Sequence, residues 1–175
     1  MIKKVFIVIF IVVFSACENK KPSAEIVNVV AEKEAINTML DAWHKSASEA
    51  AYDSYFKSMA KASVFIGTDA SENWSKKDFK AFSKPFFDRG KAWDFKSLER
   101  NVYIAADAKT AWFDELLDTW MGVCRGSGVL AKTEDGWKIE HYVLSVTIPN
   151  ENIDAVIAIK KEKDSIIVTN LKKKG

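Results

Sequence analysis

The chain has 175 residues, 48% of them hydrophobic, which suits one domain with a sizeable core plus a short appendage. Its formal charge of +2 comes from Lys3 and Lys4, since 26 basic residues less these two leave 24 against 24 acidic ones. This balance excludes the broad positive field with which many proteins hold nucleic acid.

The first seventeen residues have the parts of an export signal. Lys3 and Lys4 are followed by an unbroken apolar run at 5–14, and two small residues precede Cys17. The run is too short to cross a bilayer, which takes about 20 residues. Residues 14–17 resemble the lipobox of bacterial lipoproteins, although Leu is usual at the first position. We therefore expect lipidation of Cys17; the alternative is an ordinary secretory signal in which Cys17 is incidental.

This interpretation divides the N-terminal region into a signal peptide at 1–16 and a polar, lipidated tether at 17–31. Several acyl chains on Cys17 would hold the protein durably, because each buried methylene contributes about 0.8 kcal/mol. We expect a membrane-anchored lipoprotein of the bacterial cell envelope, in the outer membrane. The other cysteine, Cys124, is interpreted as a small buried apolar residue.

The tether leads into two predicted helices. Residues 32–48 place apolar side chains three and four positions apart, as on one face of an amphipathic helix. A second helix is predicted from Glu49 to about Ala60, with Ser48 as its N-cap.

A short strand and a third helix follow. The apolar run at 63–66 predicts a strand, and 68–74 a loop. Ser75 begins the third helix, and Gly90 ends it. Because Pro85 lies inside this helix, we expect a kink or a restart there.

From residue 92 the hydrophobic period changes to two, which predicts an antiparallel meander. Its four strands are expected at 92–105, 110–121, 123–133 and 137–147. Helices followed by a meander indicate an α+β domain at 32–148, with the helices packed on one face of the sheet. In the C-terminal extension at 149–175 we expect a helix at 151–163 and a short strand at 165–171.

Several segments in this order resemble the SnoaL-like branch of the nuclear transport factor 2-like superfamily. They are residues 64–69 with Glu72 and Trp74, then 111–115, 124–130, 136–139 and Ser145. The resemblance covers 32 to about 148 and implies a cone-shaped fold, in which N-terminal helices pack on a curved antiparallel sheet around a cavity. The superfamily includes isomerases, dehydratases, cyclases and proteins that bind or dimerise, so this fold does not decide an activity.

Strand alternation predicts which polar side chains enter the cavity. We expect the apolar members of each alternating set to face the helices and the polar members of the same sets to point inward. The predicted inward residues are Glu115, Arg125, Ser127, His141 and Ser145.

Two roles are open for the charged members of this set. Glu115 and Arg125 form either a structural ion pair or a site where Arg125 binds an anionic group of a ligand. Trp74 is a further candidate ligand-binding residue. Many relatives carry a polar residue two positions before the Ser of the last strand, and Val143 stands there instead.

Acid–base chemistry has two candidate residues. Asp69 would act at the cavity mouth, unless it caps a turn, and His141 would act inside, unless it is a satisfied core or rim histidine. Two histidines without a clustered Cys, His and Asp pattern predict no structural zinc, and no cofactor-binding motif is present.

Three functions follow from these features. The first is a membrane-anchored envelope protein whose pocket binds a small, largely apolar ligand. The second is an isomerase, dehydratase or cyclase type of enzyme that uses Asp69 or His141. The third is an interaction protein, for instance a homodimer, that pairs through the outer sheet face, where Trp112, Leu116 and Trp120 are expected.

Overall fold

The domain opens with a long helix whose start follows local capping chemistry. The structure, a computed structural model, describes residues 28–174. Helix α1 runs from Val29 to Ser48, and the side chain of Asn28 accepts a hydrogen bond from the Ala31 backbone N–H at 3.1 Å. The predicted first helix is therefore confirmed.

The second helix is shorter than predicted. Helix α2 spans Tyr52–Lys57, and strand β1 (Met59–Ile66) begins where the helix was expected to continue. Ser48 does not cap it, because its hydroxyl donates to the Lys45 carbonyl oxygen at 2.9 Å. The φ angle of 55° at Ala50 puts a turn there, through which a helix cannot run.

Strand β2 (Asn73–Ser75) and helix α3 (Lys76–Asp88) follow. Ser75 caps α3 as predicted, accepting a hydrogen bond from the Asp78 backbone N–H at 3.2 Å. The helix continues through Pro85, so the predicted restart is wrong. Pro85 is exposed, and water can satisfy the carbonyl that loses its partner.

The predicted meander of four strands is confirmed, and β1 and β2 extend it to a sheet of six strands. The strands of the meander are β3 (Lys96–Ile104), β4 (Thr110–Thr119), β5 (Gly122–Thr133) and β6 (Gly136–Val146). The sheet order is β2-β1-β6-β5-β4-β3, with β1 parallel to β6 and every other pair antiparallel. The last strand, β6, therefore lies beside the first, β1, in the middle of the sheet.

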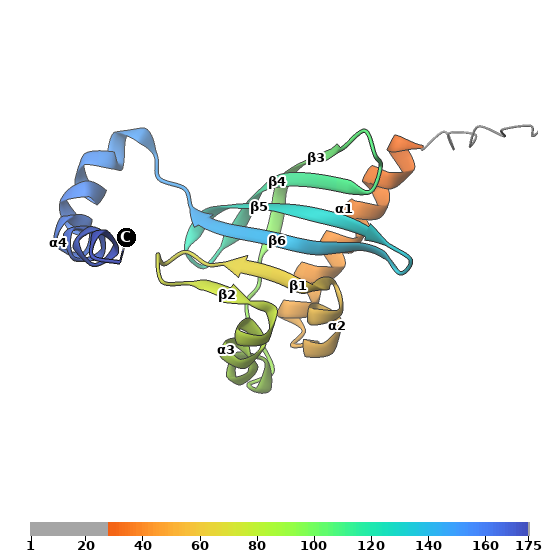
Figure 1. The fold of residues 1–175 in the computed structure, drawn as a ribbon, viewed down its shortest axis with the longest axis horizontal. Helices are drawn as coiled ribbons and strands as arrows, with labels where there is room; N and C mark the ends of the chain where they lie inside the picture. Colours follow the sequence, from red (N-terminus) through yellow and green to blue (C-terminus); the bar gives the residue numbers. More distant parts are fainter. Residues whose placement is uncertain (1–27, 175) are drawn as a thin grey trace, which may run out of the picture.

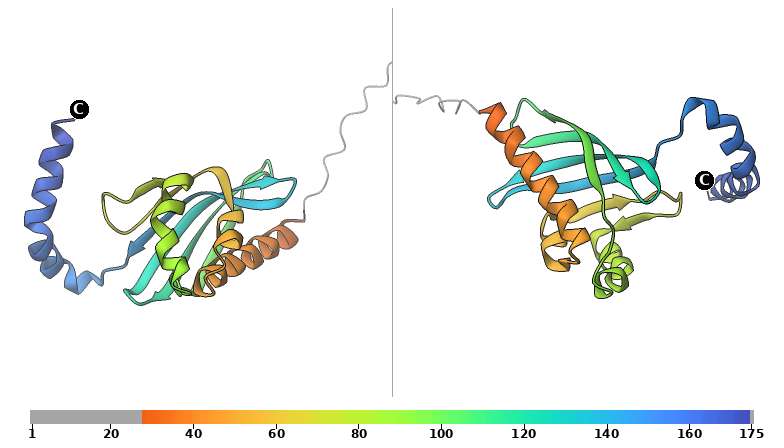
Figure 2. Two further views of the ribbon diagram at one scale, coloured as in Figure 1. Left: turned by 90° about the horizontal axis from the view of Figure 1, so that it is seen from below. Right: turned by 180° about the vertical axis from the view of Figure 1, so that it is seen from behind.

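The first three helices lie along one face of this curved, open sheet (Figures 1 and 2). The core between the layers is rich in aromatic side chains, among them Trp43, Tyr55 and Phe113, each at most 2% exposed. Cys124 is buried there too, as predicted. This arrangement confirms the α+β class, in which helices segregate to one face of an antiparallel sheet.

The C-terminal helix stands apart from the sheet. A short 3₁₀ helix, η1 (Asn150–Asn152), leads into α4 (Ile153–Lys172) beyond the end of β6 (Figure 1). None of the α4 side chains is buried. The predicted strand at 165–171 is wrong, because these residues continue the helix. Within residues 28–174, no helix has both the length and the apolar character needed to span a membrane.

Candidate functional site

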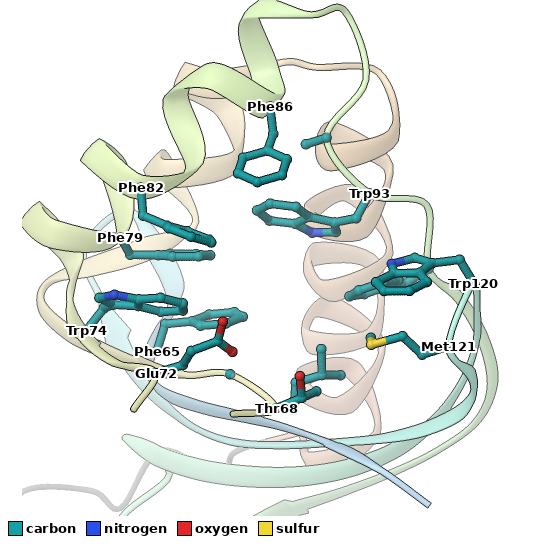
Figure 3. A pocket seen from close by; sticks show the side chains of 14 residues that line it. Phe65, Thr68, Glu72, Trp74, Phe79, Phe82, Phe86, Trp93, Trp120 and Met121 are labelled. Atoms are coloured by element: carbon teal, nitrogen blue, oxygen red, sulfur yellow. The ribbon is translucent and has the colours of Figure 1, made fainter. Parts of the chain in front are cut away.

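A cavity opens between helix α3 and the sheet edge. Its volume is about 260 Å³. The walls come from the ends of β1 and β6, strand β2 and its connection to β1, α3, the segment before β3 and the β4–β5 turn (Figure 3). The lining residues are Phe65, Gly67, Thr68, Glu72, Trp74, Phe79, Phe82, Phe86, Ala92, Trp93, Phe95, Trp120, Met121 and Leu144.

Aromatic rings dominate one wall and stack on one another. Trp74 stacks on Phe82 with ring centroids 4.5 Å apart, and Phe65 stacks on Phe79 at 4.0 Å. Trp93 continues this wall, stacking on Phe79 with ring centroids 5.8 Å apart, and Trp120 and Met121 lie on the opposite side of the cavity (Figure 3). Because these rings are held by packing between α3 and the sheet, they form a wall that suits a flat apolar ligand.

Glu72 is the one ionisable side chain in this lining. The Gly67 N–H donates to the Glu72 carbonyl oxygen at 2.9 Å, which closes the β1–β2 connection. A Cβ atom at Gly67 would lie 2.1 Å from Glu72 Oε2, so a larger residue at position 67 would displace the carboxylate from this position. The carboxylate therefore rests against the backbone of residue 67 and points into the cavity (Figure 3).

Of the predicted ligand-binding residues, Trp74 lines this cavity and the polar sheet residues do not. Asp69 and Ser145 lie instead at a second hollow, of about 560 Å³, between the β1–β2 connection, β6 and α4. The Asp69 carboxylate caps a turn, accepting hydrogen bonds from the Ser71 hydroxyl at 2.6 Å and N–H at 2.8 Å. These bonds lower the pKa of Asp69 and make it a weaker base.

The prediction that Arg125 and Ser127 face inward is wrong. On β5 the inward positions belong to Cys124 and Leu130, both 0% exposed, and to two glycines between them, whereas Arg125 is exposed on the opposite face. A Cβ at Gly126 would lie 2.3 Å from the Tyr142 hydroxyl, so a side chain cannot fit on the inner side. Arg125 consequently pairs with Leu116 across the sheet and forms no ion pair with Glu115.

His141 and Ser145 are also on the outer face, because strand β6 contains a bulge. Ile139 pairs with Leu130 while His141 pairs with Val129, so one additional β6 residue is accommodated between them. Before the bulge, the odd-numbered Trp137 and Ile139 point inward as predicted; after it, the even-numbered Tyr142 and Leu144 do. The prediction is thus wrong for His141 and Ser145.

Glu115 is buried as predicted, but with other partners. Its Oε1 accepts hydrogen bonds from His44 Nε2 at 2.8 Å and the Tyr142 hydroxyl at 3.2 Å, and its Oε2 accepts one from Arg100 Nε at 2.9 Å. Arg100 Nη1 also donates to Asp41 at 2.8 Å. This network ties α1 to strands β3, β4 and β6.

The charges and hydrogen bonds of the network decide the ionisation of Glu115. Burial alone would raise the pKa of its carboxyl group. The hydrogen bond and charge of His44 and those of Arg100 together outweigh burial, and they leave the pKa below its ordinary value. With both oxygens already engaged, Glu115 is a structural anion rather than a free ligand-binding group.

Two members of this network were missed from the sequence, although each has a signal there. His44, expected at an exposed helix edge, is 5% exposed and follows the buried Leu40 by four residues on α1. Arg100 precedes the buried Val102 by two residues on β3, which puts both on one face. Among residues 28–174, no group of three His, Cys, Asp or Glu side chains could hold a metal ion.

Residues 36–149, which are most of the described chain, match the sequence pattern of the SnoaL-like domain family. The chain belongs to this family. No curated protein matches it significantly.

Solved structures of low sequence identity share the fold. An NTF2-like protein of unknown function from Pseudomonas putida is 15% identical, with a TM-score of 0.57 over 70% of this chain and 91% of that one. A candidate dehydratase of the NTF2-like family from Streptomyces avermitilis is 12% identical, with a TM-score of 0.59 and coverage of 69% and 99%. The association domain of C. elegans CaMKII is 16% identical, with a TM-score of 0.54 and coverage of 67% and 97%. These likenesses establish the nuclear transport factor 2-like fold.

Proposed function

We propose that this protein is a lipid-anchored envelope protein whose SnoaL-like domain binds a small, largely apolar ligand. The observation that carries the proposal is the aromatic cavity of about 260 Å³ between α3 and the sheet. Ligand sites are typically concave and apolar with few polar groups, and those for drug-sized molecules begin at roughly 300 Å³. A compound of one or two aromatic rings fits these dimensions.

Binding can be tested with the neutral fluorescent probe N-phenylnaphthylamine and the purified full-length chain. Ala92 lines the cavity, so Ala92→Phe should occupy part of the space and weaken binding by at least tenfold. Ala62 is exposed on β1 and outside the cavity, so Ala62→Phe is the matched control and should bind like the wild type. Equal affinity in all three proteins would exclude this cavity as the site.

The anchoring part of the proposal depends on Cys17, which lies outside the described residues. Cys17→Ser should release the protein from the membrane fraction and stop the incorporation of labelled fatty acid. Cys124→Ser is the matched control, since Cys124 is buried in the domain and should not carry lipid. If the wild-type protein takes up no lipid, the proposed anchor is wrong.

A second candidate function is self-association through the outer sheet face. Tyr103, Trp112 and Val129 form a row across β3, β4 and β5, and they are 44%, 47% and 38% exposed. An exposed apolar row of this kind is typical of an interface. The neighbouring Leu116 is half-buried on this face, whereas Trp120 lies in the β4–β5 turn at the cavity.

Sedimentation velocity tests this second candidate. If the face pairs two copies, wild-type protein should sediment as a dimer, and Trp112→Lys should sediment as a monomer. A wild-type monomer at about 100 times the concentration of the binding assay would exclude it. The enzyme alternative loses both of its candidate acid–base residues, because neither Asp69 nor His141 lines the cavity that supports ligand binding.

A further inference from the structure

The charge of the cavity limits the class of ligand that it can accept. Fourteen residues line the cavity, and they include one carboxylate and no Lys, Arg or His. The rest of the lining is aromatic, aliphatic or small, apart from Thr68. An anionic ligand would have no counter-charge in this site and would be repelled by Glu72.

Glu72 is held in place without being neutralised. None of the described residues forms a salt bridge with it, and its Oε2 accepts one hydrogen bond, from the Asp69 backbone N–H at 3.2 Å. Glu72 also borders the second hollow, which Lys160 and Lys163 of α4 line, but neither lysine lies within salt-bridge distance of its carboxylate. The remaining lone pairs of the carboxylate are therefore available to a ligand.

The surroundings of Glu72 strengthen its interaction with a ligand. The side chain is half-buried beside Phe65 and Trp74, which exclude part of the water that would otherwise screen its charge (Figure 3). The carboxylate occupies the space that a Cβ at residue 67 would fill, and the hydrogen bond from the Asp69 N–H holds it there. A positive group that enters with an aromatic body would reach the carboxylate while its rings contact the wall.

We propose that the cavity selects aromatic compounds with a positively charged head group, and that Glu72 is the residue that selects them. The inference deepens the proposed ligand-binding function and rests on it. It is the opposite of one of the two alternatives that the sequence left open, in which Arg125 binds an anionic group of a ligand. The aromatic wall provides affinity for the body of the ligand, and Glu72 discriminates by charge.

Three probes of similar shape distinguish the contribution of charge to binding from that of apolar contact. Phenyltrimethylammonium, tert-butylbenzene and benzenesulfonate share a benzene ring with a tetrahedral head, and they carry a positive, zero and negative charge. Binding to the purified full-length chain is followed by NMR line broadening of the ring protons that all three share. We expect the cation to bind about tenfold more tightly than its neutral isostere, because a partly desolvated pair of unit charges at contact supplies this factor. The anion should bind most weakly.

Glu72→Gln keeps the size of the side chain and the acceptor for the Asp69 N–H, and removes the charge. In this variant the affinity for the cation should fall to within about twofold of the affinity for the neutral isostere. The affinity for the neutral isostere should stay as it is in the wild type. Asp69→Asn is the matched control, because it removes one charge from the same connection at a position outside the cavity. It should preserve the preference for the cation.

The outcomes distinguish this inference from the proposed function. If the neutral isostere binds as tightly as the cation, or if Asp69→Asn weakens the cation as much as Glu72→Gln does, selection by Glu72 is wrong and an apolar pocket remains. If none of the three probes binds, each tested up to its limit of solubility, the proposed function fails and the inference fails with it.

Discussion

Replacing Arg100 tests whether the buried network holds α1 against the sheet. The Arg100 side chain is 6% exposed and that of Glu115 is 0% exposed, with Arg100 Nη2 and Glu115 Oε2 2.9 Å apart. Arg100→Met would remove this charge and leave the carboxylate with His44 and Tyr142 as its partners. Because breaking a buried pair from one side typically costs about 3–5 kcal/mol, we expect a loss of that size in the free energy of unfolding.

The double variant Arg100→Met with Glu115→Leu should recover part of this loss, since no carboxylate is then left without its main counter-charge. Recovery should be incomplete, because the Tyr142 hydroxyl loses its acceptor, and an unsatisfied buried polar group costs about 1–3 kcal/mol. The free energy of unfolding of the wild type, the single variant and the double variant is measured by urea unfolding at pH 7, followed by tryptophan fluorescence.

Arg125→Met is the matched control for this experiment. Arg125 is exposed on the outer sheet face, so this change should alter the free energy of unfolding by less than about 0.5 kcal/mol. Equal losses from Arg100→Met and Arg125→Met would refute the assignment of the two arginines to opposite faces. A stability unchanged by Arg100→Met would refute a structural role for the network.

Three further predictions follow from the same geometry. Because the pKa of Glu115 is lowered in the folded state, its contribution to stability is present above the ordinary value of 4.5 and is lost as the pH falls through the lower folded-state pKa. Acid unfolding of Glu115→Gln should therefore show a shallower loss of stability below pH 4.5, and a profile as steep as that of the wild type would contradict this. Ile139→Ala should cost about 2–5 kcal/mol in urea unfolding as a core truncation, whereas the neighbouring Lys138→Ala should cost less than about 0.5 kcal/mol; similar losses would mean that the β6 register is wrong. Gly128→Ala should lower the thermal midpoint, because its Cβ would lie 2.6 Å from the His141 carbonyl oxygen and overpacking of this kind costs about 1–3 kcal/mol; an unchanged midpoint would place residue 128 in open space.

The elements of this domain are largely encoded in local sequence patterns. The apolar spacing in α1, the Ser75 cap of α3 and the period of two after residue 92 depend on neighbours within a few positions. Such signals survive without tertiary context, because capping and alternation follow from local backbone geometry. The inward faces of β4 and of the start of β6 were predictable for the same reason.

The site itself depended on contacts that no local pattern contains. On β5 the inward positions carry Gly126 and Gly128, which give no hydrophobic signal, so alternation assigned Arg125 to the wrong face. On β6 one bulge residue reversed the faces of His141 and Ser145, since a slip of one position exchanges the two sides of a strand.

Cavity formation is likewise a tertiary event. Trp74 on β2, Trp93 before β3 and the aromatic residues of α3 meet only when the helix packs on the sheet edge. The sequence by itself determined α1, α3, the four strands of the meander and the heavy aromatic content. Tertiary packing decided which aromatic rings line the cavity, and it placed the carboxylate of Glu72, from the short β1–β2 connection, among them. The reason is that the position of a side chain in a cavity depends on partners that are distant in the chain.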